Sequence, residues 1–359
     1  MSAAPEKLRV ALVGCGRIGA HTPPHVRAAC PPGWLPLSHA EAITTTPGLE
    51  LVAVCDADAA RAETTAKEFG ASRWFTDYRK LIEEVRPDLL SIATRTDGRC
   101  DIIEFAATNG VRGIHAEKPL GRSRAKCQRA LSAVAAHGAN LSYGTTRRYM
   151  DAYREAKRVF AEGSFGALQQ ATLEFGCSAL LWTHPHSVDL AVFFSGAREV
   201  EFVQATCAIP TEAINGHVVD ADPKVESAFI QFTNGVRATL TCAGGLHTHL
   251  AGENGSITVG ADGSWLESNK KAASDDAYPL AHKRWKPTAS LSGTQRAFAE
   301  LADAIRGHGA LGITPEEIAL GCDILFAITW SSLQGGRRVT LAEVPADLTI
   351  TGRSGALFA

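Results

Sequence analysis

Short apolar runs alternate with longer amphipathic stretches from residue 8 to about residue 145. A run such as Leu89-Leu90-Ser91-Ile92-Ala93 is apolar on both faces of an extended strand, as in strands that lie between two layers of helices. Regular alternation of strands and helices is typical of a parallel sheet wrapped by helices. The pattern predicts strands at 8–13, 50–55, 88–93, 112–116 and 140–144, with helices at 57–69, 77–86, 99–109 and 123–137.

The second half of the chain has a different periodicity. After a predicted helix at 149–162, several segments alternate apolar and polar residues with a period of two, the spacing of half-buried strands. The turn Asn234-Gly235 between two of them favours a hairpin. The segment 262–290 has no clear period and is interpreted as a long surface loop. Strands are predicted at 167–176, 199–208, 225–233, 236–243 and 255–260, and helices at 185–195, 292–307 and 315–334.

We therefore expect an α/β fold of two domains: a doubly wound parallel sheet in residues 1–145, and an α+β domain in residues 146–359. The 359 residues, 45% of them hydrophobic, are enough for two cores. The net charge is −2 and no basic stripe is visible, so a nucleic-acid partner is not expected. The sequence lacks a run of about 18 apolar residues, so no membrane association is expected either.

Cysteine usage and the N-terminus point to the cytoplasm. The nine cysteines include no C-x-x-C pair, and several lie inside apolar runs, as Cys55 does at the end of Leu51–Cys55. Buried, reduced thiols explain this distribution best. Met1 to Lys7 is polar and too short for a signal peptide.

The predicted first strand leads directly into Gly14-Cys15-Gly16-Arg17-Ile18-Gly19. In a G-x-G-x-x-G turn one glycine permits the tight turn, one lets the backbone approach a pyrophosphate, and one lets helix and strand pack closely. The helix that follows presents free N–H groups to the phosphates. Its place after a strand makes this turn a strong indication of a dinucleotide cofactor.

Asp56 closes the second predicted strand, where an acidic residue commonly binds the adenosine ribose hydroxyls. A carboxylate there repels a 2′-phosphate, so we expect NAD, with NADP less favoured although Arg17 could attract a phosphate. A helix cap or turn residue is the other interpretation of Asp56.

The interval between Gly19 and Asp56 is unusually long. Residues 20–38 contain Pro23-Pro24, Pro31-Pro32, Trp34 and Pro36, which a continuous helix cannot accommodate. We interpret this stretch as an inserted loop, with the actual helix near residues 39–46. The loop is either a lid at the cofactor or substrate cleft, with Trp34 as a packing anchor, or a surface or subunit contact.

Glu117-Lys118-Pro119 follows the predicted strand at 112–116. Ligands in a doubly wound sheet lie beyond the carboxyl ends of the strands, which places Lys118, and Thr94 after the preceding strand, beside the cofactor. The peptide bond before Pro119 can be cis. A lysine near a cationic nicotinamide should have a lowered pKa and hydrogen-bond a substrate oxygen.

The segment Trp182-Thr183-His184-Pro185-His186-Ser187-Val188-Asp189 is a second candidate for the chemistry. The imidazole of His186 can take a hydroxyl proton near neutral pH. Asp189, three residues later, could orient His186 or hold the helix in place. On its own, His186 would more often be a structural residue; its combination with Lys118 favours a catalytic role.

With these motifs the chain resembles the Gfo/Idh/MocA oxidoreductases, relatives of glucose–fructose oxidoreductase and inositol dehydrogenase. The resemblance rests on the glycine turn, Glu117-Lys118-Pro119 and His186-x-x-Asp189, and covers roughly residues 8–340. It implies an N-terminal Rossmann domain that binds NAD, followed by a second domain built on a large open, mostly antiparallel sheet. Members form homodimers or homotetramers through that sheet. It also implies NAD(P)-dependent interconversion of a secondary alcohol and a ketone on a sugar, glycoside or cyclitol.

The resemblance assigns residues to roles. Lys118 would contact the reacting oxygen and His186 would transfer the proton. Arg147, Arg148 and Tyr149 fall where members often have an arginine and an aromatic residue near the substrate, and His184 joins this set. Two positions depart from the family pattern: Trp182 replaces an aspartate and could serve as an apolar platform for a sugar, and Arg99 replaces a histidine.

Other functions stay open at this point. The pairs His184-x-His186 and His247-x-His249 could share a face if they lie in strands, but their spacing does not favour a metal site. An NAD-dependent glycosidase that oxidises and re-reduces its substrate, or a non-catalytic sensor of NAD or sugar, would use the same fold.

Overall fold

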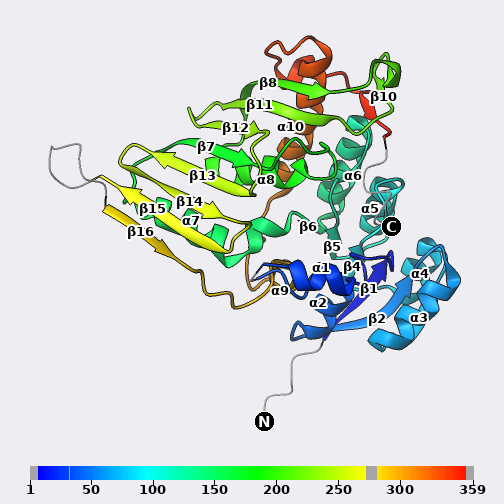
Figure 1. Ribbon diagram of the computed structural model, residues 1–359. Helices are drawn as coiled ribbons and strands as arrows, with labels where there is room; N and C mark the ends of the chain where they lie inside the picture. The colour runs from blue at the N-terminus through cyan, green and yellow to red at the C-terminus, as the bar shows by residue number, and fades with distance from the viewer. Residues whose placement is uncertain (1–6, 32, 272–280, 353–359) are drawn as a thin grey trace.

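Two sheets organise the chain, as the computed structural model shows for residues 7–31, 33–271 and 281–352 (Figure 1). The first is a six-stranded sheet in the order β3-β2-β1-β4-β5-β6, and its strands pair in parallel throughout. This order is that of a dinucleotide-binding Rossmann fold. The strands are β1 (Leu8–Val13), β2 (Leu49–Cys55), β3 (Arg73–Phe75), β4 (Leu89–Ile92), β5 (Gly113–Ala116) and β6 (Asn140–Tyr143).

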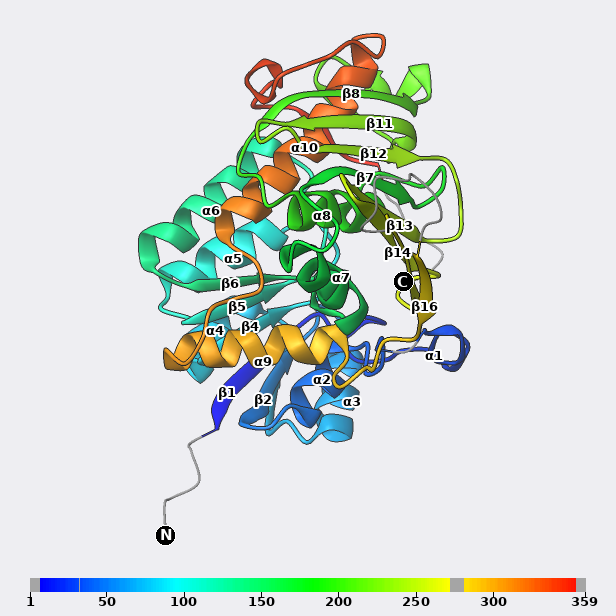
Figure 2. The ribbon, with the colours of Figure 1, turned by 90° about the vertical axis from the view of Figure 1, so that its left-hand side faces the viewer.

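Helices account for the apolar character of these strands on both faces. Every residue of β4 and β5 is buried, because helices lie on either side of the sheet. The covering helices are α2 (His39–Thr45), α3 (Ala59–Phe69), α4 (Tyr78–Val85), α5 (Arg99–Thr108), α6 (Arg124–His137) and, from late in the sequence, α9 (Gly293–Arg306). Helix α9 packs on β5 and β6 and shares a core with β1 through Phe298 and Leu301 (Figure 2). The division into 1–145 and 146–359 stays a prediction.

The second sheet has eight strands in the order β16-β15-β14-β13-β7-β12-β11-β8. Its pairs are antiparallel except β7 with β12, so the expected open, mostly antiparallel sheet is confirmed. The hairpin at Asn234-Gly235 joins β11 to β12. The strands are β7 (Leu168–Glu174), β8 (Val200–Ala208), β11 (Lys224–Phe232), β12 (Arg237–Thr241), β13 (His247–Gly252), β14 (Gly255–Gly260), β15 (Trp265–Lys270) and β16 (Ala281–Trp285).

Helices α7 (Asp151–Ala161), α8 (His184–Ser195) and α10 (Pro315–Leu333) pack on one face of this sheet (Figure 2). Leu173, Leu250 and Ile257 point into that interface and are fully buried. Alternate residues face the other side, where His249 lies opposite Thr172 and Thr258 in the register. The remaining short elements are α1 (Pro24–Ala29), β9 (Ile214–Asn215), β10 (Val218–Val219), β17 (Thr349–Ile350) and the 3-10 turns Thr146–Tyr149, Thr211–Ala213 and Leu341–Glu343.

The interpretation of 262–290 as a long surface loop was wrong. Strands β15 and β16 lie within it, while residues 272–280 fall outside the described residues. Polar residues dominate β16 because it is the edge strand, held by backbone pairing with β15 rather than by burial of side chains. Strand β13, with its two histidines, was also missed.

The inserted segment interrupts the first helix of the Rossmann fold. The N–H of Ala20 bonds the carbonyl of Gly16, which forms one turn, and the chain then leaves for 18 residues before α2 begins. The N–H groups of His39 and Ala40 bond the carbonyls of Ile18 and Gly19, at 2.9 and 2.8 Å. Helix α2 therefore continues the turn in space, which confirms the predicted helix near residues 39–46.

Candidate active site

The three glycines of the turn after β1 have three different surroundings. Gly14 has a φ of +100°, and a side chain there would meet the carbonyl of Ala93, the residue that follows β4. A Cβ on Gly19 would lie 1.9 Å from the carbonyl oxygen of Gly14, so only glycine fits between turn and helix. A Cβ on Gly16 would meet no atom of the described residues within 4 Å. The backbone at Gly16 thus lies open to an approaching phosphate, as a dinucleotide site requires.

A cavity of about 610 Å³ extends from this turn across the carboxyl ends of the first sheet to the start of α8. It is large enough for a small-molecule site and is lined by residues from both halves of the chain. Of the residues predicted to bind cofactor, all except Gly19 line it: Gly14, Gly16, Arg17, Ile18, Asp56, Thr94, Glu117, Lys118 and Pro119. Of the residues predicted to bind substrate, Lys118, Trp182 and His186 line it.

Asp56 lies at the end of β2, facing the glycine turn. Its carboxylate accepts a hydrogen bond from the backbone N–H of Cys15 at 2.8 Å and another from that of Asp58 at 2.9 Å. Arg61 approaches the same carboxylate at 3.6 Å, with its side chain half exposed. Asp56 therefore makes the hydrogen bonds of a turn residue. It also lines the cavity, as a residue that binds the adenosine ribose must.

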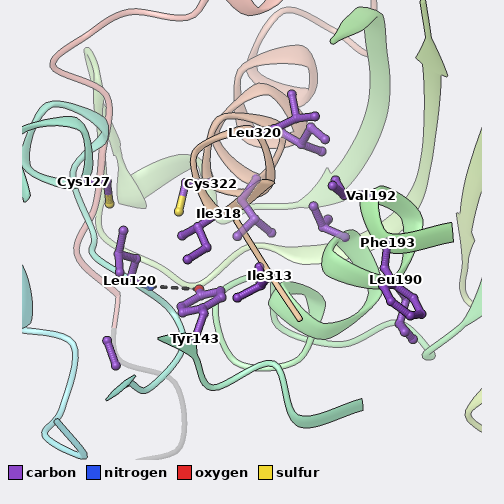
Figure 3. Close-up of a cluster of buried hydrophobic side chains, with 14 of the residues drawn as sticks. Leu120, Cys127, Tyr143, Leu190, Val192, Phe193, Ile313, Ile318, Leu320 and Cys322 are labelled. Atoms are coloured by element: carbon purple, nitrogen blue, oxygen red, sulfur yellow. Dashed lines mark hydrogen bonds between the residues drawn. The ribbon is translucent and has the colours of Figure 1, made fainter. Parts of the chain in front are cut away.

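The turn that carries Lys118 is held by two buried side chains, those of Tyr143 and Arg99. The Lys118–Pro119 peptide bond is cis. The hydroxyl of Tyr143, at the end of β6, accepts a hydrogen bond of 3.1 Å from the N–H of Leu120 (Figure 3). The buried guanidinium of Arg99 donates to the carbonyls of both Pro119 and Thr94. Arg99 thus links the ends of β4 and β5, which gives this departure from the family pattern a structural role.

Lys118 projects from this turn toward α8. Its amino group donates a hydrogen bond of 2.7 Å to the carbonyl oxygen of Trp182 and lies 4.5 Å from the centroid of that indole. Burial lowers the pKa of Lys118 to about 8, and the positive charges of Arg147, Arg99 and Arg17 act in the same direction. Glu117 partly offsets this shift. A lysine with such a pKa can change protonation state in the physiological range.

Glu117 is buried and belongs to a polar network that sequence reasoning missed. His39, at the start of α2, lies with Nε2 3.3 Å from the Glu117 carboxylate and with Nδ1 2.7 Å from the hydroxyl of Ser91. Burial alone would raise the pKa of Glu117, but the His39 hydrogen bond and the charges of His39, Lys118 and Arg99 outweigh it and lower that pKa to about 2. The site therefore keeps a fixed anion next to Lys118.

The two histidines at the start of α8 have different surroundings. His186 lines the cavity, and its buried Nδ1 has no hydrogen-bond partner among the described residues. Burial, Arg147 and Lys118 hold the pKa of His186 well below its ordinary range, so the imidazole is neutral at neutral pH. His184 faces the interior, with Nδ1 2.9 Å from the hydroxyl of Ser187. Because both lie on a helix, the shared-face argument for a metal pair does not apply to them.

Arg147, Arg148 and Asp189 are buried in ion pairs outside the cavity lining. Arg148 bonds Asp189 at 3.0 Å and Glu317 at 3.0 Å, so Asp189 anchors α8 to the 3-10 turn rather than orienting His186. Arg147 makes two hydrogen bonds to Asp262, at 2.6 and 2.8 Å. Tyr149 is buried as well, with its hydroxyl 3.2 Å from that of Ser142.

The described part of the chain contains no group of three or more His, Cys, Asp or Glu residues placed to hold a metal ion. Within the same residues, no helix is both long enough and apolar enough to span a bilayer. Of the cysteines, five are buried, at positions 15, 55, 100, 127 and 322, whereas Cys177 and Cys242 are exposed. Burial raises the pKa of Cys15 and of Cys55 to about 12, so neither is a reactive thiolate.

Comparison with known proteins gives relatives along much of the chain. A scyllo-inositol 2-dehydrogenase (NAD(+)) of Bacillus subtilis strain 168 is 28% identical over 275 residues, covering 71% of this chain and 74% of that protein. An inositol 2-dehydrogenase of Salmonella typhimurium is 29% identical over 161 residues; the match covers 44% of this chain and 43%, less than half, of that protein. The structure of a levoglucosan dehydrogenase in complex with NADH and L-sorbose superposes with a TM-score of 0.74 at 20% identity, covering 95% of this chain and 99% of that one.

A family profile matches the part of the chain that forms the first sheet. It is the profile of the GFO_IDH_MocA oxidoreductase family, described by its NAD-binding Rossmann fold, and it matches residues 8–145. The match includes the glycine turn, Asp56 and Lys118, which the cavity brings together. This part of the chain therefore has the NAD-binding Rossmann fold of the Gfo/Idh/MocA oxidoreductases.

Proposed function

We propose that the protein is an NAD-dependent dehydrogenase, or the corresponding reductase, that interconverts a secondary alcohol and a ketone on a sugar, glycoside or cyclitol. The observation that carries this proposal is the single cavity lined by the open glycine turn, by Lys118 and by His186. The names of the relatives support the substrate class, because they include dehydrogenases of inositols.

The residues present fit NAD. The open backbone at Gly16 would take the pyrophosphate and the carboxylate of Asp56 would take the adenosine ribose. When bound, the nicotinamide supplies the redox chemistry by accepting a hydride from the alcohol or returning it to the ketone. Thr94, Glu117 and Pro119 line the cavity beyond the glycine turn, which is where the reactive end of the cofactor would lie.

The chain's own groups handle the oxygen and its proton. Lys118, cationic below a pKa of about 8, would donate a hydrogen bond to the substrate oxygen in place of the Trp182 carbonyl that it now bonds. Neutral His186 would take the hydroxyl proton during oxidation and return it during reduction. The nearby charges of Lys118 and Arg147 disfavour imidazolium and so promote release of that proton.

The assembly belongs to the same proposal. The face of the second sheet opposite α7, α8 and α10 is broad and carries Thr172, His249 and Thr258, and we propose that a homodimer or homotetramer forms through it in the cytoplasm. Sedimentation velocity of the purified protein tests this part separately.

The activity is tested by absorbance at 340 nm with a panel of inositols, pyranoses and glycosides, with NAD and NADP in parallel. We expect NADH to accumulate with at least one cyclic polyol. The proposal would be contradicted if no compound of the panel reduced either coenzyme and if none of the corresponding ketones were reduced in the reverse direction.

A further inference from the structure

The inserted segment of residues 20–38 is fixed to the second half of the chain at three carbonyl groups. The carbonyl of Gly33 accepts a hydrogen bond from the N–H of Gly293 at 3.1 Å, and that of Pro36 accepts one from the Ser292 hydroxyl at 2.8 Å. The carbonyl of Leu37 accepts a third from the Thr294 hydroxyl at 3.3 Å. The donors all belong to the start of α9, whose N-cap is Ser292. The end of the insertion is therefore a fixed wall of the cavity, held by hydrogen bonds to α9, rather than a hinged lid.

Trp34 is fixed within this wall by a buried ion pair. The guanidinium of Arg147 lies 5.0 Å from the centroid of the Trp34 indole and 5.0 Å from that of the Phe175 ring. Asp262 holds the same guanidinium through two hydrogen bonds, and its backbone carbonyl accepts a long hydrogen bond of 3.4 Å from the Trp34 indole nitrogen. Arg147 thus acts as a support for the indole, and its charge is balanced by Asp262.

Two apolar pairs of side chains line the cavity. Trp34 and Leu37 come from the insertion, and Leu181 and Trp182 come from the segment that leads into α8. Each pair is a leucine and a tryptophan, contributed by a different half of the chain. Lys118 and His186 line the same cavity and supply polar groups for one reacting carbon.

From this arrangement we infer that Trp34 is a specificity-determining residue, whose indole packs against the C–H face of a saturated ring and selects cyclic polyols over open-chain ones. The inference rests on the proposed function and names its substrate class more narrowly. A flat indole gains most contact from a rigid ring whose C–H bonds point to one side. An open-chain polyol would have to lose conformational freedom to offer the same surface.

The experiment compares Trp34→Leu with Trp34→Phe in the full-length protein. Steady-state rates with NAD are measured for the best cyclic polyol of the panel and for mannitol as the open-chain probe. Leucine keeps apolar volume without a flat face, whereas phenylalanine keeps the flat face. Trp74→Leu, at an indole that is 43% exposed on β3, is the matched control. Calorimetric titration with NAD, with and without the polyol, reports binding separately from turnover.

We expect Trp34→Leu to raise the KM for the cyclic polyol about ten-fold and to lower the cyclic-to-open-chain ratio of kcat/KM by a similar factor. The Kd for NAD should stay within about two-fold, and Trp34→Phe should recover most of the lost KM. An unchanged ratio in Trp34→Leu, or an equal loss of NAD binding, would overturn the inference. Those results require an active wild type, so they differ from failure of the proposed function, in which the wild type itself oxidises nothing in the panel.

Discussion

The amino group of Lys118 lies beneath the indole of Trp182, 4.5 Å from its centroid, and donates a 2.7 Å hydrogen bond to the carbonyl of the same residue. The family resemblance implies that many Gfo/Idh/MocA members have an aspartate at the position of Trp182. In this protein, which lacks that aspartate, the carboxylate next to Lys118 is that of Glu117, held by His39. The carboxylate thus comes from the same turn as the lysine.

Replacing Lys118 removes the group that would hold the reacting oxygen. We expect Lys118→Met to lower kcat by about 10²-fold or more, because an apolar side chain of similar length cannot donate the hydrogen bond. NAD binding, measured by calorimetry, should be nearly unchanged. Lys126→Met, at an exposed site on α6, is the control. Full turnover in Lys118→Met would exclude the proposed role.

The pH dependence of oxidation should follow Lys118. Its pKa is lowered to about 8, so the donor form is present below that pH and is lost as the pH rises through it. Since His186 is already neutral at these pH values, we expect kcat/KM to fall above about pH 8. Glu117→Gln removes an anion that raises the pKa of Lys118, so the fall should move to lower pH. Activity that increases through pH 8 would instead assign the proton-accepting role to the neutral amine.

The preference for NAD should depend on Asp56. We expect Asp56→Ala to weaken NAD and to raise the NADP-to-NAD ratio of kcat/KM by about ten-fold, because the repelling carboxylate is gone. Arg61, 3.6 Å from this carboxylate, would then face the 2′-phosphate. Asp58→Ala, which removes the N-cap of α3, controls for local destabilisation. If the ratio does not change, another residue recognises the ribose.

Buried histidines should make the fold sensitive to acid. Burial lowers the pKa of His115 to about 3 and that of His184 to about 4. An unfolded chain takes up these protons near pH 6.5, so the unfolding free energy should decrease as the pH falls below that value. Each such histidine contributes about 1.4 kcal/mol per pH unit until its folded-state pKa is reached. Above pH 6.5 the effect is absent.

Urea unfolding between pH 5 and 8 measures this slope. His115→Asn keeps a hydrogen-bonding group near the Ser142 hydroxyl but does not titrate. The slope of unfolding free energy against pH should therefore be shallower in this variant, by about 1.4 kcal/mol per pH unit. His282→Asn, at an exposed histidine on the edge strand, should leave the slope unchanged. Equal slopes in wild type and His115→Asn would contradict the buried, neutral state of His115.

Local signals in the sequence predicted much of the fold. Short-range patterns of glycine, proline and apolar residues predict three features. These are the glycine turn, the ends of the strands before Asp56 and Lys118, and the break in the first helix. The edge strand β16 carries no apolar signal, since pairing with β15 rather than burial defines it. Propensity along the chain cannot detect a strand of that kind.

Partners of the site residues were harder to predict than the residues themselves. Arg147 and Asp262 are 115 positions apart, and Asp262 lay in a segment interpreted as loop. His39 and Glu117 are 78 positions apart and meet where α2 begins beside the end of β5. Arg147 was expected at the substrate, but a buried arginine needs an anion, and Asp262 supplies it. Such pairings depend on tertiary packing and leave no local pattern.

The most direct test of the account is the fate of the hydrogen on the reacting carbon. The active cyclic polyol, fully deuterated on carbon, is incubated with NAD and the protein, and the reduced coenzyme is analysed by mass spectrometry. We predict NADH that carries one deuterium, formed at a rate lowered by about 10²-fold or more in Lys118→Met. Oxidised product accompanied by unlabelled NADH, or by no reduced coenzyme, would contradict direct transfer between substrate and nicotinamide in this cavity.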